Sequence, residues 1–181
     1  MYIGGLYYTM IKFEKVSLEQ FTEDYLKCMH GNSDVDIDED EAKYILSVWN
    51  NIKLPERATV DSAGYDFYLP YDHIFSSDVD TLLPTGIRWI TDDPSTVLLC
   101  MPRSGLGFKY GLRLKNTIGV IDSGYWKSDN EGHIMAKIQA DSYFSLESGK
   151  AFMQGIITKY CIVDDDNAQG VRNGGFGSTG M

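Results

Sequence analysis

The chain has 181 residues and a formal net charge of −10. This length suits one compact domain with appendages, and a hydrophobic content of 43% is ordinary for a soluble globular protein. The negative field disfavours extended binding to nucleic acid or to an anionic membrane. Binding of a small polyanion is not excluded, because a metal ion, a few Arg side chains and backbone N–H groups can hold it locally.

The cysteines and the N-terminal sequence indicate in which cellular compartment the protein functions. Cys28, Cys100 and Cys161 are an odd number without CxxC spacing, which argues against a disulfide framework or a zinc site. The N-terminus lacks a basic region and a cleavage site, and no apolar run is long enough to span a membrane. We expect a cytoplasmic protein in which residues 1–10 form a disordered leader.

Two short helices are expected before the β-rich region. Ser17-Leu-Glu-Gln20 has the form of a capping box, and apolar residues follow at helical spacing, which predicts an amphipathic helix over residues 17–29. An acidic stretch after it resembles a calcium loop only superficially, because Glu39 stands where that loop requires Gly. We interpret it as a solvated helix start, followed by a helix over residues 40–50. Residues 11–52 are therefore predicted to form a helical N-terminal extension.

From Leu54 onward, short β-prone runs alternate with Gly, Pro, Asp and Asn, as in a sandwich, jelly roll or barrel. We expect residues 53–163 to form this β domain. The glycine-rich tail, residues 164–181, has too little apolar content to form core, so we expect it to be flexible by itself. The predicted strands cover residues 65–68, 81–83, 88–91, 96–101, 112–114, 119–121, 134–139 and 152–160.

Five segments combine turn residues with polar groups in a pattern that folding alone does not explain. They are Ser62–Asp66, Pro102–Gly107, Asn116–Tyr125, Gly149–Gln154 and the tail around Gly170–Gly180. In order and approximate spacing they resemble the five motifs of the trimeric dUTPase family. The resemblance covers about Leu54 to Gly180. It implies an all-β, jelly-roll-like (β-clip) barrel, and the helical extension resembles that of some bacterial and phage members.

The resemblance implies a homotrimeric, Mg²⁺-dependent enzyme that hydrolyses dUTP to dUMP and pyrophosphate, keeping uracil out of DNA and supplying dUMP for dTMP synthesis. Asp122 matches the catalytic carboxylate that activates the attacking water, a role for which a carboxylate in hydrogen-bond reach is competent. Tyr125 matches the aromatic residue that packs beneath deoxyribose and excludes a 2′-hydroxyl. Asn116, with the backbone of Gly119 and Ile121, matches the hairpin that receives uracil.

Other motifs imply the phosphate and metal contacts. Arg103, Ser104 and the Gly105 amide match a segment that contacts phosphate from a neighbouring subunit. Gln154 matches a donor to the α-phosphate. Asp66 matches a carboxylate that holds Mg²⁺ through water, since Mg²⁺ keeps several waters and takes most direct ligands from phosphate.

The tail matches the family's lid. Phe176 would stack on uracil, while Arg172, Ser178 and Thr179 would hold the β- and γ-phosphates, and Gly177 would let the backbone approach the nucleotide. Closure of the lid would exclude water and align the α-phosphate for attack.

Three positions depart from the family pattern. Ala151 stands where Arg is common, and Gly124 stands where a second Asp is common. Arg172 is one residue closer to the following Gly-Gly-Phe than in many relatives. We expect altered contacts between strands or subunits at the first two positions rather than lost activity.

Two alternatives stay open at this point. A dCTP deaminase has a similar fold but needs a buried glutamate, for which Glu147 in Ser145-Leu-Glu147 is the nearest candidate. A dUTPase-fold regulator would bind a protein partner through the N-terminal helices or the loop Lys127–Gly132.

Overall fold

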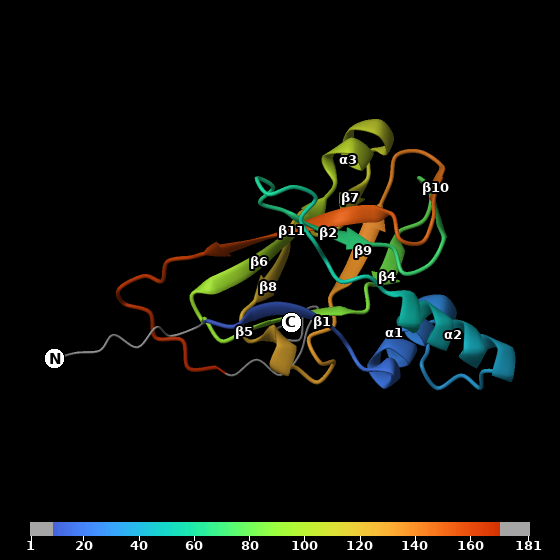
Figure 1. The fold of residues 1–181 in the computed structure, drawn as a ribbon, viewed down its shortest axis with the longest axis horizontal. Coiled ribbons are helices and arrows are strands. Elements are labelled where there is room, and N and C mark those ends of the chain that lie inside the picture. Colours follow the sequence, from blue (N-terminus) through green and yellow to red (C-terminus); the bar gives the residue numbers. More distant parts are fainter. Residues whose placement is uncertain (1–8, 171–181) are drawn as a thin grey trace.

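The computed structural model describes residues 9–170 and consists mainly of antiparallel β-structure with two helices at one end (Figure 1). The prediction of an all-β body preceded by helices is confirmed. No helix in the described part of the chain is both long and apolar enough to cross a membrane.

The largest sheet has four strands in the order β2-β11-β6-β8, and a three-stranded sheet has the order β4-β9-β7. Two further pairs, β1 with β5 and β3 with β10, extend the body. Every pairing is antiparallel. The strands are β1 Ile11–Lys15, β2 Tyr65–Tyr68, β3 His73–Phe75, β4 Thr81–Pro84, β5 Ile87–Thr91, β6 Thr96–Pro102, β7 Arg113–Leu114, β8 Gly119–Asp122, β9 Met135–Gln139, β10 Phe144–Leu146 and β11 Ala151–Lys159.

All eight predicted strands are present, with ends that differ by one residue at most. β1, β3 and β10 were not predicted. β1 lies within the segment that the sequence led us to expect as helical, and it pairs with β5 more than seventy residues away. Such short strands depend on a distant partner for their hydrogen bonds, so local patterns do not identify them.

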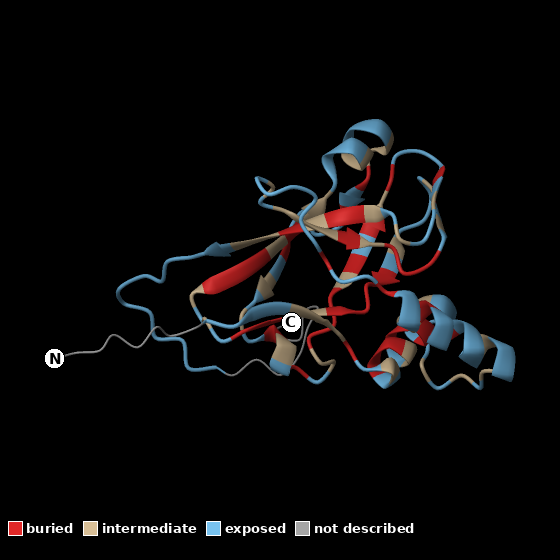
Figure 2. Cartoon of the chain, viewed as in Figure 1, coloured by how far each residue is buried: buried red, intermediate tan, exposed pale blue. Residues whose placement is uncertain are grey.

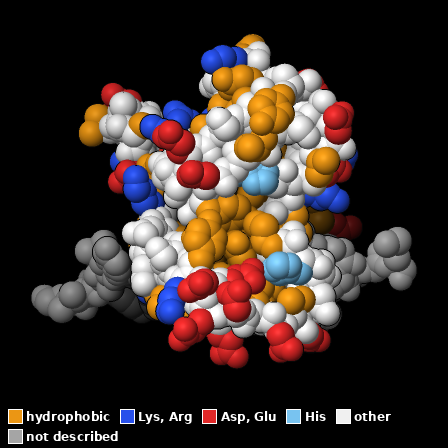
Figure 3. Space-filling model, turned by 90° about the vertical axis from the view of Figure 1, so that its right-hand side faces the viewer, with side chains coloured by type: hydrophobic (Ala, Val, Ile, Leu, Met, Phe, Trp, Pro, Cys, Tyr) orange, Lys and Arg blue, Asp and Glu red, His pale blue; other side chains and the backbone are white. Residues whose placement is uncertain are grey.

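Both N-terminal helices, α1 Leu18–His30 and α2 Glu39–Asn51, are confirmed. Ser17 caps α1 by accepting a hydrogen bond from the Gln20 N–H, as the capping box predicts. Asp38 caps α2, and the acids of its first turn suit the positive end of the helix. Acidic side chains accordingly gather at the helical end of the molecule (Figure 3).

The core is continuous from the β-strands into the helices, where buried residues of α1 face the body (Figure 2). Phe21 on α1 is completely buried, and Ile45 on α2 is 1% exposed. Gly86, between β4 and β5, has a φ of +71°. A Cβ there would collide with Ile52 Cδ1 and lie 3.3 Å from Phe21 Cδ2. Glycine therefore supplies both the left-handed backbone and the space into which the extension packs.

Two short helical segments were not predicted: α3 Ser104–Tyr110 and the 3₁₀ turn η1 Tyr125–Lys127. α3 contains Gly105 and Gly107, which are poor helix formers, so its sequence does not favour a helix. It ends at Gly111, whose φ of 63° and N–H bonds to preceding carbonyls stop the helix.

Phe21→Ala should destabilise the whole protein, because it removes a fully buried ring that joins α1 to the β body. We expect a loss of about 3–5 kcal/mol, seen as a lower denaturant midpoint at fixed protein concentration. Leu46→Ala, at a side chain on α2 that is 43% exposed, is the matched control and should cost less than about 0.5 kcal/mol. Equal, small effects of the two substitutions would mean that the extension is not part of the folded core.

Candidate active site

A pocket of about 180 Å³ lies between the four-stranded sheet and the β4-β9-β7 sheet. Three of the residues predicted to receive a base, Asn116, Gly119 and Ile121, line it. The rest of the wall is largely apolar and comes from β6, β11 and the residues in and directly beside β7 and β9: Cys100, Leu114, Lys115, Ile134, Met135, Ala136, Lys137 and Met153. A small concave site with apolar walls and a few polar groups suits a planar heterocycle. We call it the nucleoside pocket.

The turn between β7 and β8, which belong to different sheets, contributes Asn116 to the nucleoside pocket. Thr117 has a φ of 67°, which is uncommon for a residue other than glycine. The Thr117 N–H donates to the Leu114 carbonyl at 3.0 Å, which closes the turn. At the start of β8, a Cβ on Gly119 would lie 3.2 Å from Cys100 Cβ. Glycine thus lets β8 approach β6 closely at the pocket.

Cys100, in the wall of the nucleoside pocket, is 2% exposed. Burial raises the pKa of its thiol to about 12. The thiol therefore stays protonated near neutral pH and acts as a small apolar surface, not as a nucleophile.

Asp122 is the last residue of β8 and directly follows Ile121, a residue of the pocket wall. It is exposed. Tyr125 begins η1 three residues later and is 5% exposed. Its hydroxyl donates to the His133 carbonyl at 3.1 Å and accepts from Asn130 Nδ2 at 3.0 Å. These two hydrogen bonds fix the hydroxyl end of the Tyr125 ring.

A second group of predicted residues lines another depression, which we call the anion cluster: Asp66, Arg103, Ser104 and Gln154. Arg103 Nε lies 3.4 Å from Asp66 Oδ1, and the side chains of these residues are 46% and 14% exposed, respectively. A Cβ at Gly64 would lie 2.7 Å from Gln154 Oε1, so glycine leaves space for the amide group. The cluster presents a cation, an amide and a hydroxyl, which are suitable donors to phosphate oxygens.

Gly105 lies beside the anion cluster. It lines an adjoining depression together with Arg103, Ser104 and Ala151. A Cβ on Gly105 would meet no atom within 4 Å. The first residues of α3 thus present open backbone next to the Arg103 side chain.

The nucleoside pocket and the anion cluster lie on opposite faces of the four-stranded sheet. Met153 and Gln154 are consecutive in β11, and successive side chains of a strand point to opposite faces. Met153 lines the nucleoside pocket, whereas Gln154 lines the anion cluster with Asp66, its partner in β2. A single chain thus brings the predicted residues together in two separate groups.

The positions that depart from the family pattern have simple surroundings. Ala151 begins β11 opposite Tyr68 and lies in the depression that contains Arg103. A Cβ on Gly124 would meet no atom within 4 Å, so an acidic side chain would fit there. The tail residues Arg172, Phe176, Gly177, Ser178 and Thr179 lie outside the described residues.

Sequence reasoning missed much of the pocket wall, notably Cys100, Ala136 and Met153. These residues read as ordinary buried strand positions, and only the pairing of β6 with β8 and β11 brings Cys100 beside Gly119 and Gly155. The one local signal was Gly119 itself, since a glycine within a strand often marks a close approach of another backbone or a ligand.

Comparisons with known proteins identify the family of this chain. The dUTPase family model matches residues 50–180. The deoxyuridine 5′-triphosphate nucleotidohydrolase of Lactococcus lactis is 37% identical over 134 residues, covering 71% of this chain and 89% of the relative. The protein of the same name from Tolumonas auensis is 34% identical over 142 residues, covering 74% of this chain and 91% of the relative.

A solved structure of the dUTPase from Streptococcus mutans matches with a TM-score of 0.56 at 35% identity, covering 61% of this chain and 88% of that one. This likeness agrees with a jelly-roll β-clip fold. Because the family model spans most of the chain and relatives of this identity cover more than two thirds of it, the chain belongs to the dUTPase family.

Proposed function

We propose that this protein hydrolyses dUTP to dUMP and pyrophosphate as a homotrimer, in sites that combine the nucleoside pocket of one subunit with the anion cluster of another. The observation that carries this proposal is the placement of the two groups on opposite faces of one sheet. A nucleotide bound in the pocket cannot pass its phosphates through that sheet to Gln154 and Arg103 of the same chain. A cyclic assembly brings the anion cluster of a second copy to the mouth of the pocket.

Selection of the base would occur in the nucleoside pocket. Uracil presents two carbonyl oxygens and one N–H along one edge, and backbone groups of the segment from Asn116 to Ile121 would pair with that edge. The apolar wall that includes Ala136 and Met153 leaves little room for the thymine methyl group. The donor pattern of cytosine would leave polar groups unpaired, which is costly in such a site.

In the chemical step, Asp122 would orient a water and accept its proton as the water attacks the α-phosphorus in line with the pyrophosphate leaving group. Arg103, Ser104 and Gln154 of the neighbouring subunit would donate to the phosphate oxygens on which negative charge develops. The tail, with Arg172 and Phe176, would close over the bound nucleotide and exclude water.

The donor set also fits Mg²⁺. Within residues 9–170, no group of three or more His, Cys, Asp or Glu side chains is arranged to hold a metal ion. Asp66 is the carboxylate of the anion cluster, and Mg²⁺ commonly keeps its waters and takes direct ligands from phosphates. Asp66 would therefore hold the ion through water, and the bound ion would neutralise charge on the triphosphate.

The deaminase alternative receives no support. Its reaction needs a buried glutamate, but Glu147 is exposed in the turn that follows β10. The proposed role is thus in deoxynucleotide metabolism of the cytoplasm, where removal of dUTP keeps uracil out of DNA and supplies dUMP.

A substrate panel tests the proposed reaction directly. With Mg²⁺, pyrophosphate release should be fast from dUTP and at least about a hundredfold slower from dCTP, dTTP and UTP, because each of them lacks a matching edge or adds a group that does not fit. Ammonia release from dCTP would instead establish the deaminase reaction, and comparable rates on UTP would overturn the proposed role of Tyr125.

Asp122→Asn should lower kcat on dUTP by about 10²–10⁴-fold, because the amide cannot accept the proton of the attacking water. Binding of a non-hydrolysable dUTP analogue, measured by calorimetry, should change only a few-fold. Retention of full activity by this variant would rule out Asp122 as the base.

Mixing two inactive variants tests the shared site. Asp122→Asn and Arg103→Ala should each be inactive, but hybrids formed by co-refolding equal amounts should recover about one quarter of wild-type activity, since one site in four would then combine two intact parts. The control is each variant co-refolded with itself. No recovery, with hybrid trimers demonstrated by native mass spectrometry, would contradict a site shared between subunits.

A further inference from the structure

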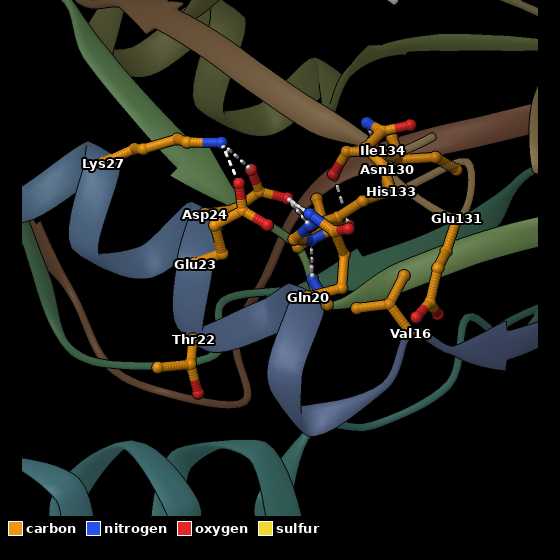
Figure 4. Close-up of polar contacts among 12 residues, drawn as sticks. Val16, Gln20, Thr22, Glu23, Asp24, Lys27, Asn130, Glu131, His133 and Ile134 are labelled. Atoms are coloured by element: carbon orange, nitrogen blue, oxygen red, sulfur yellow. Dashed lines mark hydrogen bonds and ion pairs between the residues drawn. The ribbon is translucent and has the colours of Figure 1, made fainter. Parts of the chain in front are cut away.

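The helix α1 reaches the loop that carries Tyr125, although α1 lies outside the region matched by the family model. Asp24 is on α1, whereas the family model begins at residue 50. Asp24 Oδ2 lies 2.6 Å from Nδ1 of His133, a residue more than a hundred positions later (Figure 4). The extension therefore makes a polar contact with the segment that follows the catalytic motif.

His133 is held on both ring nitrogens. The Gly86 N–H donates to His133 Nε2 at 2.7 Å, so Nε2 must offer a lone pair and the proton resides on Nδ1. Nδ1–H then donates to Asp24, and the side chain is 0% exposed. A buried imidazole with two directional bonds has one orientation, and its own backbone is held with it.

The carboxylate of Asp24 is also held from its own helix. Gln20 Nε2 donates to Asp24 Oδ2 at 2.9 Å (Figure 4). Burial alone would raise the pKa of Asp24, but the hydrogen bonds from His133 and Gln20, with the nearby Lys27, hold its pKa below the ordinary value. Asp24 is thus an ionised acceptor across the neutral range.

Gln20 is free for this contact because the capping box is completed by a different residue. In a complete capping box, the Gln20 side chain would accept a hydrogen bond from the Ser17 N–H. Here the Ser17 N–H donates to Glu131 Oε2 instead, at 2.9 Å. Glu131 also lies 3.5 Å from Arg88. The start of α1 therefore holds the same loop at a second point, two residues before His133.

The loop passes this restraint to Tyr125. The His133 carbonyl accepts the hydrogen bond from the Tyr125 hydroxyl at 3.1 Å. The backbone of Tyr125 is held separately, because Ser128 Oγ donates to the Tyr125 carbonyl at 2.6 Å. The hydroxyl end of the ring is thus held by the His133 peptide and by Asn130, whose amide also donates to the His133 carbonyl at 3.4 Å.

We infer that Asp24 and His133 are positioning residues that set the place of the Tyr125 ring and so sharpen rejection of a 2′-hydroxyl. This inference rests on the proposed role of Tyr125 beneath the sugar. Steric rejection requires a ring that does not yield, and each bond in the chain from Asp24 through His133 to the Tyr125 hydroxyl removes one way in which the ring could move.

The test is the ratio of kcat/KM for dUTP to kcat/KM for UTP. Asp24→Ala should lower this ratio on the order of tenfold, because it leaves the His133 Nδ1–H unpaired and frees the peptide that holds Tyr125. Asp24→Asn keeps an acceptor oxygen of the same shape and should restore most of the ratio. Failure of Asp24→Asn to do better than Asp24→Ala would contradict a role based on this hydrogen bond.

Ile45→Ala is the matched control for loss of stability. Ile45 is 1% exposed on α2 and belongs to the same extension, so its truncation destabilises this part of the core without removing a bond to His133. At a temperature well below both unfolding midpoints, this variant should keep the wild-type ratio. An equal fall of the ratio in Ile45→Ala would show that Asp24 acts only through general stability, and the inference would be wrong.

Tyr125→Phe tests the same series of hydrogen bonds at its Tyr125 end. It replaces Asp24→Ala as the test if that variant does not fold. It keeps the ring but removes the hydroxyl and so its bonds with His133 and Asn130. The ratio should fall by a similar factor, and adding Asp24→Ala should have little further effect. Full additivity, or an unchanged ratio in Tyr125→Phe, would overturn the inference. If the wild-type protein itself does not distinguish dUTP from UTP, the proposed role of Tyr125 fails first.

Discussion

The alternation of side chains along β11 is the constraint on which the proposed chemistry depends. Because Met153 and Gln154 are neighbours in an extended strand, one faces the nucleoside pocket and the other must face away from it. No rotamer change can bring both to one ligand. Under the proposed function, the strand separates the groups for the base on one face from the groups for the phosphates on the other, and assembly of subunits would bring them together. Oligomerisation would then be part of catalysis.

A negatively charged protein can bind a negatively charged substrate only if its cations are placed locally. The chain carries a formal charge of −10, and acidic side chains gather at the helical end of the molecule (Figure 3). In the anion cluster, the guanidinium of Arg103 is restrained by Asp66. Such a pair keeps the cation in place before substrate arrives and reduces the conformational entropy lost on binding. The overall field then disfavours large polyanions while the site still accepts a small one.

The sequence was most informative where a signal is local. Short-range patterns predicted the capping residue Ser17, the helix start near Asp38 and eight strands, and the structure agrees with them. It was least informative where a partner is distant. β1 needs β5, α3 forms despite its glycines, and Asp24 meets His133 across 109 positions. Motif matching likewise named Gln154 but not Met153, because an apolar strand residue carries no sign that it lines a pocket.

The packing of Phe21 and Ile52 against Gly86 also limits how far the N-terminus of this protein could be shortened. The region matched by the family model begins at residue 50, yet the core also includes buried residues between positions 16 and 48. A chain shortened to the matched region would expose the apolar surface that now lies under α1 and leave a buried imidazole without its acceptor. Loss of the extension would therefore require compensating replacements at positions such as His133 in the same lineage. The folded core of this chain thus begins well before the region that the family model matches.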